Sequence, residues 1–372
     1  MDFTYLLDEL TRGFTNFTWG NGVMILAGMV LIALAVIKEY EPVLLLPIGF
    51  GCIMANIGMS TDVGFMKVIY DAGIATELFP LLIFVGVGAM IDFSPLLAQP
   101  KMVLLGAAGQ FGIYGTLLLA LLLGFDLPQA ASIGVIGAID GPTAIFVGSK
   151  LAPELLAPIA VAAYSYMSLI PIIQPPVMKL LTTRKERLIR MEYAPRPVSR
   201  LTLVVFPIFV TLVVSLVAPD AAPLIASLML GNLLRESLVV DRLSKAAQNE
   251  IVNISTLFLG LAIGATMKAD SFLNLQTLMI LGLGLIAFVL DTVMGLLFGK
   301  LMSVMSGHKI NPLIGACGIS AFPMAGRLSA KMAQEEDFEN FILMHAMGAN
   351  TAGQLGSVIA GGLLLALVNG ML

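Results

Sequence analysis

Long apolar runs separated by short polar breaks recur along the whole of this 372-residue chain. Several runs approach the roughly 20 residues that one crossing of a bilayer needs, whereas others are too short for a straight crossing. We therefore predict about ten or eleven crossings, some of them broken helices or hairpins that do not traverse fully. The runs fall near residues 21–37, 43–57, 79–91, 102–124, 130–149, 151–174, 201–218, 221–234, 251–267, 275–299, 310–328 and 341–368.

Composition agrees with this pattern, because 58% of the residues are hydrophobic, 12% are charged and the mean hydropathy is +0.96. These values predict an all-α polytopic membrane protein. No cleaved signal peptide is expected at the start of the sequence. Residues 1–20 instead show apolar side chains at helical spacing followed by Trp19, which is typical of a helix lying at the membrane interface.

The longest polar break, residues 179–200, is strongly basic and divides the chain into two membrane halves, 21–178 and 201–372. Cytoplasmic loops carry an excess of Lys and Arg, so we expect this loop to be cytoplasmic. Its basic residues are Lys179, Arg184, Lys185, Arg187, Arg190, Arg196 and Arg200.

The two halves share a faint repeat. Placing Ile136-Gly137-Ala138 over Ile314-Gly315-Ala316 also aligns Gly148 with Gly326, without a gap. Both segments, 130–149 and 310–328, contain helix breakers within apolar sequence. Interrupted helices at corresponding positions of two halves are typical of secondary transporters, which bind substrates and ions near mid-membrane.

Asp140 lies in the first of these segments, followed by Gly141, Pro142 and Thr143. A carboxylate at bilayer depth costs roughly 2.5–3.5 kcal/mol on insertion scales, so it usually faces a cavity, a partner charge or an ion. Proline removes a backbone donor and opens the helix before it, which frees carbonyl oxygens. Carboxylate, carbonyl and hydroxyl oxygens together suit a small cation, although a kinked helix with its Asp hydrogen-bonded to a neighbour is the alternative.

The second segment supplies Asn311, Gly315, Ser320 and Arg327, and two further polar groups lie in apolar surroundings. Tyr166 is interpreted in one of two ways: as a tyrosine of the membrane interface or core, or as a functional residue. Asn350 either joins two helices through a hydrogen bond or belongs to a site. Arg327 is either an interfacial anchor or the partner of a carboxylate.

Other chemistry is weakly represented. Cys52 and Cys317 are far apart and read as small core residues, and His308 and His345 do not form a ligand pair. Nothing in the chain resembles a nucleotide-dependent enzyme or a nucleic-acid-binding protein.

Four separated segments in the same order closely resemble the β subunit of the sodium-translocating carboxylic-acid decarboxylases. They are Ile136–Phe146, Ala162–Met167 with the Gln174-Pro175-Pro176 that follows, Asn311–Arg327 and Gly348–Gln354. The resemblance covers nearly the whole chain. It implies an elevator-type transporter fold with inverted repeats.

The resemblance also implies a function. In this family a soluble carboxyltransferase α subunit moves a carboxyl group from an acid such as oxaloacetate, methylmalonyl-CoA or glutaconyl-CoA onto biotin held by a carrier subunit. The β subunit decarboxylates the carboxybiotin, consumes a proton and drives Na⁺ outward. A homotrimeric β core, a small membrane γ or δ subunit and a location in the bacterial cytoplasmic membrane are implied as well. The chain lacks the family's biotinylated lysine between two methionines, so biotin must arrive on a partner.

Carried over residue by residue, the family's sodium-site aspartate falls on Asp140 and its essential tyrosine on Tyr166. The polar residues of its second interrupted region fall on Asn311, Gly315, Ser320 and Arg327, and its later asparagine on Asn350. We expect Asp140, Thr143, Asn311, Gly315, Ser320 and Asn350 to surround Na⁺, and Arg327 to hold the carboxylate of carboxybiotin. A stand-alone Na⁺/H⁺ antiporter or sodium–carboxylate symporter and a noncatalytic membrane anchor are the competing classes.

Overall fold

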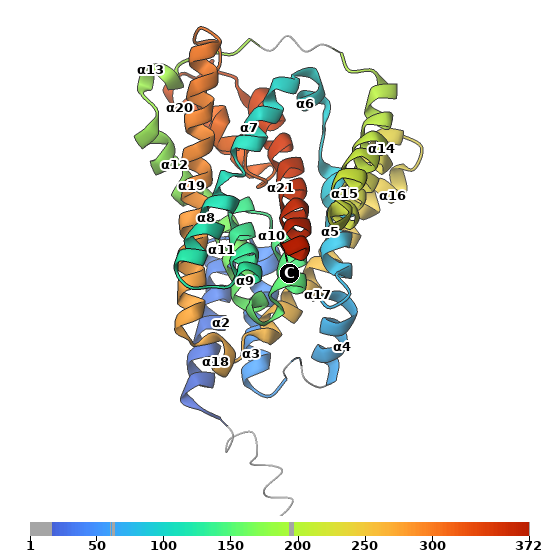
Figure 1. Ribbon diagram of the computed structural model, residues 1–372, viewed down its shortest axis with the longest axis vertical. Helices are drawn as coiled ribbons and strands as arrows, with labels where there is room; N and C mark the ends of the chain where they lie inside the picture. The colour runs from blue at the N-terminus through green and yellow to red at the C-terminus, as the bar shows by residue number, and fades with distance from the viewer. Residues whose placement is uncertain (1–16, 60, 62–63, 193–196, 372) are drawn as a thin grey trace, which may run out of the picture.

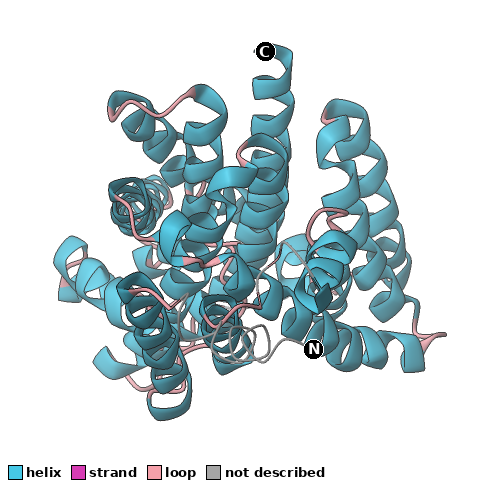
Figure 2. Cartoon of the chain, turned by 90° about the horizontal axis from the view of Figure 1, so that it is seen from below, coloured by secondary structure: helices cyan, strands magenta, loops and turns pink. Residues whose placement is uncertain are grey.

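The computed structural model describes residues 17–59, 61, 64–192 and 197–371, and within these residues all regular structure is helical (Figures 1 and 2). Six described helices are long and apolar enough to cross a membrane, or up to eight spans if each of two bent helix pairs is one span. The all-α membrane class predicted from the sequence is therefore confirmed. The bent pairs are Gly64–Gly73 with Leu78–Met90, at 56°, and Pro153–Met167 with Ile170–Leu181, at 64°.

This number is smaller than the ten or eleven crossings expected from the apolar runs. Several of those runs form short helices, such as Pro42–Asn56 and Leu127–Ala138. A helix rises about 1.5 Å per residue, so helices of this length fall short of the roughly 30 Å hydrocarbon core. Most of the predicted interfacial helix at 1–20 lies outside the described residues. The first described helix begins at Trp19, where the Thr18 hydroxyl accepts a hydrogen bond from the backbone N–H of Asn21.

The helices pack in two groups, and most helix-to-helix contacts lie within a group. The first helix group comprises α2 (Trp19–Ile37), α3 (Pro42–Asn56), α4 (Gly64–Gly73), α5 (Leu78–Met90), α14 (Arg200–Val217), α15 (Ala222–Ser237), α16 (Asp241–Ala246), α17 (Val252–Thr266) and α18 (Ala269–Phe272).

The second helix group contains both interrupted segments and the long helices around them. It comprises α6 (Ser94–Ala98), α7 (Val103–Ala108), α8 (Phe111–Leu122), α9 (Leu127–Gly134), α10 (Gly141–Leu151), α11 (Leu156–Ser168), α12 (Ile170–Leu181), α13 (Arg184–Arg187), α19 (Leu275–Met305), α20 (Met324–Glu336) and α21 (Leu343–Met371).

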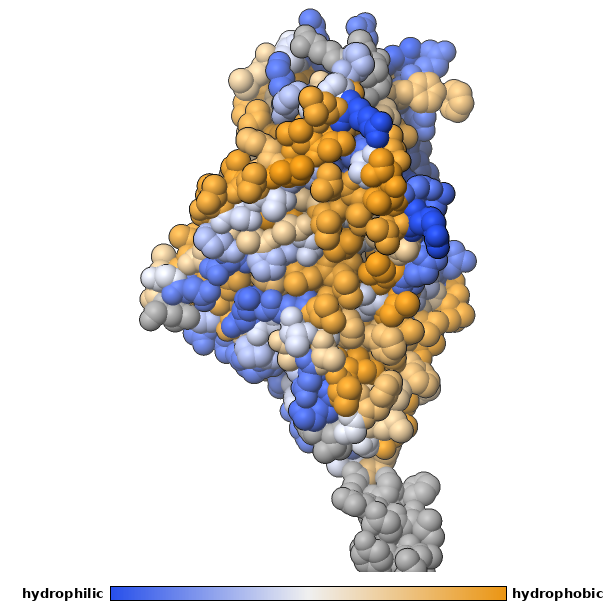
Figure 3. Space-filling view, turned by 90° about the vertical axis from the view of Figure 1, so that its right-hand side faces the viewer, coloured by the Kyte–Doolittle hydropathy of each residue, from blue (hydrophilic) through white to orange (hydrophobic). Residues whose placement is uncertain are grey.

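One side of the first helix group is strongly apolar. Figure 3 shows a broad area of hydrophobic side chains on the face that carries the right-hand helices of Figure 1. Leu201, Leu212 and Leu216 on α14 are each more than half exposed. An exposed apolar surface of this kind belongs against lipid or another membrane helix rather than water.

Both interrupted segments contain a 3₁₀ helix followed by a non-helical stretch and then an α-helix. Helix α9 tightens into a 3₁₀ turn at Val135–Ala138, opens at Ile139 and Asp140, and resumes as α10. The second segment forms a 3₁₀ helix at Pro312–Cys317 and resumes as α20. Pro142 occupies the first turn of α10, where its missing N–H leaves no helical hydrogen bond unmade. The two breaks meet, because the Ser320 hydroxyl donates to the Ala138 carbonyl at 2.6 Å.

Candidate functional site

Asp140 caps the N-terminus of α10 and is 5% exposed. One carboxylate oxygen accepts from the Thr143 backbone N–H at 3.4 Å. The other oxygen accepts from the Gln354 amide and the Ser357 hydroxyl of α21, each at 2.9 Å. All three donors are neutral, and Asp140 takes part in no ion pair among the described residues. A buried carboxylate with only neutral partners is a favourable position for a cation.

The facing break contributes further oxygen atoms. The residue before Ser320 is Ile319, and its carbonyl accepts a hydrogen bond from the Asn350 amide at 2.7 Å. The side-chain oxygen of Asn350 is itself buried and has no hydrogen-bond partner among the described residues. A hard cation such as Na⁺ exchanges its water shell for carboxylate, carbonyl and hydroxyl oxygens of this kind.

A cavity of about 250 Å³ lies between the two helix groups beside Asp140. Asp140, Ser320, Gln354 and Tyr164 of the second helix group line one side. The opposite side is formed by α3, α5 and α17 of the first helix group, with Glu41, Asn253 and Thr256 as its polar residues. Thr143 and Asn350 are fully buried and do not line this cavity. No cluster of three or more His, Cys, Asp or Glu residues suited to a metal ion occurs in the described parts of the chain.

The structure separates the two tyrosines of α11. The Tyr166 hydroxyl donates to the Leu281 carbonyl of α19, and its ring lies against Gly284. Tyr164 instead faces the cavity, and its ring lies directly over Gly141. The residue carried over from the family, Tyr166, is therefore not part of the cavity lining, whereas its neighbour two positions earlier is.

Asn311 and Gly315 contact other parts of the chain and not Asp140. The Asn311 amide donates to the carbonyls of Arg187 and Ile189, both at 2.9 Å, and its oxygen accepts from the Leu313 N–H at 3.0 Å. Gly315 allows the second break to approach α19 closely, since a Cβ there would come within 2.1 Å of the Gly295 carbonyl oxygen. The structure thus joins these two residues to the basic segment and to α19.

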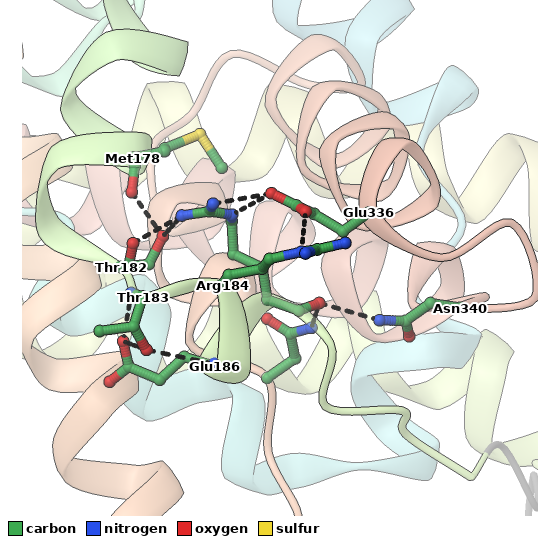
Figure 4. A network of polar contacts seen from close by, with 9 residues as sticks. Met178, Thr182, Thr183, Arg184, Glu186, Glu336 and Asn340 are labelled. Carbon is green, nitrogen blue, oxygen red and sulfur yellow. Dashed lines mark hydrogen bonds and ion pairs between the residues drawn. The ribbon is translucent and has the colours of Figure 1, made fainter.

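Arg327 lies on an exposed part of α20, away from the lining of the cavity. Part of the segment predicted as a cytoplasmic loop, residues 184–190, is held by ion pairs against the end of the same helix (Figure 4). Arg187 pairs with Glu336 at 2.7 Å, and the Asn340 amide donates to the Arg187 carbonyl at 3.0 Å. The hydrogen bond from Arg187 holds the pKa of the Glu336 carboxyl below its usual range. Lys300 on α19 also reaches this segment, with its ammonium 3.2 Å from Glu186.

Sequence reasoning missed four groups around Asp140: Gln354, Ser357, Tyr164 and Glu41. Gln354 and Ser357 follow Asn350 at spacings of four and seven residues, so they share its face of the helix. That spacing was a usable signal. Neither Tyr164 nor Glu41 carries a comparable signal in the sequence.

The helices, their two facing breaks and the buried carboxylate between them define a membrane protein of the transporter class, with a polar cavity at the junction of two helix groups. The family described as the Na⁺-transporting oxaloacetate decarboxylase beta subunit matches residues 20–368. The chain belongs to this family, whose members are β subunits of Na⁺-transporting decarboxylase complexes.

Three relatives illustrate the similarity. The glutaconyl-CoA decarboxylase subunit beta of Acidaminococcus fermentans is 55% identical, over 96% of this chain and 96% of the relative. The methylmalonyl-CoA decarboxylase subunit beta of Veillonella parvula is 53% identical, over 96% and 95%. The oxaloacetate decarboxylase beta chain of Klebsiella pneumoniae is 47% identical, over 95% and 96%. Its alignment spans 416 positions, more than the 372 residues of this chain, so that relative carries insertions absent here.

Proposed function

We propose that this chain decarboxylates carboxybiotin presented by a partner and couples that reaction to outward movement of Na⁺ across the bacterial cytoplasmic membrane. The overall chemistry releases CO₂ from carboxybiotin and leaves biotin carrying a proton. The observation that carries the proposal is the buried Asp140 carboxylate, which has only neutral donors and borders a cavity between two helix groups. Moving one charge against 100 mV costs about 2.3 kcal/mol, so ion movement has to be tied to the exergonic chemistry.

Asp140 supplies the charge of the proposed Na⁺ site, and Ser320 supplies a hydroxyl that lines the same cavity. Asn350 donates to the Ile319 carbonyl of the second break, and Thr143 lies in the first turn of α10. The buried side-chain oxygens of both residues are proposed as further ligands of Na⁺. Arg327 is the proposed contact for the carboxylate of carboxybiotin, because its exposed guanidinium suits bidentate binding of a carboxylate. Tyr166 is proposed to act through its contact with α19.

The partners proposed for this chain are a soluble carboxyltransferase subunit, a biotin-carrier subunit and a small membrane subunit, around a homotrimeric core of the chain itself. The carrier is required because the closest approach to a biotinylation sequence, Thr266-Met267-Lys268-Ala269, lacks the second methionine. Co-purification of a biotinylated polypeptide in detergent tests this composition. Gradient-driven sodium uptake by the lone chain in vesicles would favour a stand-alone transporter instead.

The central test is Asp140→Asn in the purified complex. We expect this variant to lose Na⁺-dependent release of CO₂. The reason is that Asp140 supplies the negative charge that the second helix group contributes to the cavity, and the cation would no longer be attracted by it. Transfer of the carboxyl group from the acid to the biotin carrier should continue, since that step takes place on other subunits. Radiolabelled CO₂ and carboxylated carrier are measured in the same preparation. Turnover at the wild-type rate in Asp140→Asn would remove this carboxylate from the function.

A further inference from the structure

A second carboxylate borders the Asp140 cavity from the opposite helix group. Glu41 precedes the first turn of α3, and its side chain does not cap that helix. Its carboxylate makes no hydrogen bond or ion pair with any described residue. Glu41 is half-buried and lines the cavity together with Asn253 and Thr256. An acid that makes no hydrogen bond to its own helix, yet borders the Asp140 cavity, is available to attract a cation.

Tyr164 connects the two sides of the cavity. Its side chain is 1% exposed, and its hydroxyl is buried without a hydrogen-bond partner among the described residues. Buried tyrosine hydroxyls usually find a partner, so this one lacks the group that it would normally bind. The ring lies over Gly141, next to Asp140, and Tyr164 lines the same cavity as Asp140 and Glu41.

We propose that Glu41 and the Tyr164 hydroxyl form an access site for the transported alkali cation, through which it reaches or leaves Asp140. This inference rests on the proposed function, because it takes Na⁺ as the ion that Asp140 binds. Glu41 supplies charge on the first helix group, and Tyr164 supplies a neutral oxygen on the second. The cation therefore meets oxygen ligands in succession, which replaces its water shell in steps rather than at once.

Because the two acids lie on different helix groups, the access site depends on how the groups are arranged. Glu41 belongs to the first helix group, whereas Tyr164 and Asp140 belong to the second. A displacement of one group against the other changes the separation of Glu41 from Asp140 but keeps Tyr164 beside Asp140. The access site is then complete in one arrangement of the groups and divided in the other, as alternating access requires.

The first test titrates NaCl into the purified complex at constant ionic strength, with choline chloride as the balancing salt, and measures CO₂ release. We expect Glu41→Gln to raise the KM for Na⁺ about tenfold, equivalent to about 1.4 kcal/mol, with kcat nearly unchanged. The reason is that the lost charge acts on capture of the cation and not on decarboxylation. Glu39→Gln is the matched control, because Glu39 is an exposed acid in the same connection between α2 and α3 and does not line the Asp140 cavity. A wild-type KM in Glu41→Gln overturns the proposal.

The second test uses the pair of tyrosines on α11. Tyr164→Phe removes only the hydroxyl and should raise the KM for Na⁺ severalfold. Tyr166→Phe removes a hydroxyl that is bonded to Leu281, so it should lower kcat or the yield of folded complex without raising that KM. A raised KM in Tyr166→Phe alone would contradict the access site.

Asp140→Asn, assayed beside these variants, separates this inference from the proposed function. If Asp140→Asn is inactive while Glu41→Gln and Tyr164→Phe have wild-type KM values, the access site is wrong and the sodium function stands. If Asp140→Asn keeps wild-type Na⁺-dependent turnover, the sodium function itself fails.

Discussion

At the residue scale, Asp140 combines a structural and a chemical role. As the N-cap of α10 it accepts a backbone N–H, and it lies where the helix dipole favours a negative charge. Gln354 and Ser357 hold its other oxygen, so the carboxylate is fixed before a cation arrives. Fixed ligands bind an ion with less loss of entropy than mobile ones. Gly141 completes the arrangement because it leaves room for the Tyr164 ring.

Gly141→Ala tests that close approach. A Cβ at this position would lie 2.1 Å from the Tyr164 ring, so the ring or α10 must move. We expect a loss of about 1–3 kcal/mol of stability, the usual cost of overpacking, together with weaker binding of Na⁺.

Gly148→Ala in the same helix is the control for Gly141→Ala. Its Cβ would first meet the flexible end of Leu156, at 3.3 Å, and a helix-interior alanine is favourable by up to about 1 kcal/mol. Thermal unfolding in detergent and the KM for Na⁺ measure both variants. Equal unfolding temperatures and equal KM values in the two variants would show that the position of the Tyr164 ring does not depend on Gly141.

At the element scale, the second break is connected directly to the basic segment that contains Arg187 and Ile189. Asn311 caps the 3₁₀ helix at Pro312–Cys317 and at the same time holds the carbonyls of Arg187 and Ile189. Ser320, at the far end of this break, bonds to the Ala138 carbonyl two residues before Asp140. We therefore expect a displacement of the basic segment to reach the backbone beside Asp140 through this one short element.

Asn311→Ala is expected to weaken this connection. The two carbonyls lose their amide donor, at a cost of about 1–3 kcal/mol if they stay buried, and the 3₁₀ helix loses its cap. Turnover at saturating NaCl should fall, and trypsin should cut the segment around Arg187 more readily.

Asn340→Ala provides the comparison, because Asn340 also donates to the Arg187 carbonyl but belongs to neither break. It should increase cleavage by trypsin while leaving turnover at saturating NaCl unchanged. If both variants lowered turnover equally, the connection would not pass through Asn311.

At the scale of the whole molecule, the Asp140 cavity lies at the junction of the two helix groups rather than inside either. Contacts between the groups include the ion pair of Lys150 on α10 with Glu77, the residue before α5, at 3.0 Å. A cavity formed by two packed groups can change its accessibility when the groups move as units.

A reversible cross-link between the groups tests whether turnover needs such movement. In the double variant Glu77→Cys with Lys150→Cys, a short bis-methanethiosulfonate reagent should stop Na⁺ transport, and dithiothreitol should restore it. The two native cysteines, Cys52 and Cys317, are buried and should react poorly. Each single variant treated with the same reagent is the control. Full transport in the cross-linked complex would show that the groups need not separate at this contact.

The membrane class and the positions of both breaks could be predicted from the sequence alone. These follow from local chemistry: apolar runs exclude a water-soluble fold, and the Gly141-Pro142 pair interrupts a helix whatever surrounds it. The number of crossings did not follow, because a short apolar run such as Pro42–Asn56 has the composition of a span without its length.

Which polar side chains meet depends on how the helices pack, and this could not be predicted from the sequence. Tyr164 and Tyr166 are two residues apart, about 200° around the helix axis, so the rotation of α11 in its packing selects which one faces Asp140. Asn311 and Ser320 lie in one break, yet the first turns to the basic segment and the second to Asp140. Glu41 reaches the cavity from a different helix group altogether. Helix rotation and long-range packing set these directions, and neither is encoded in local sequence pattern.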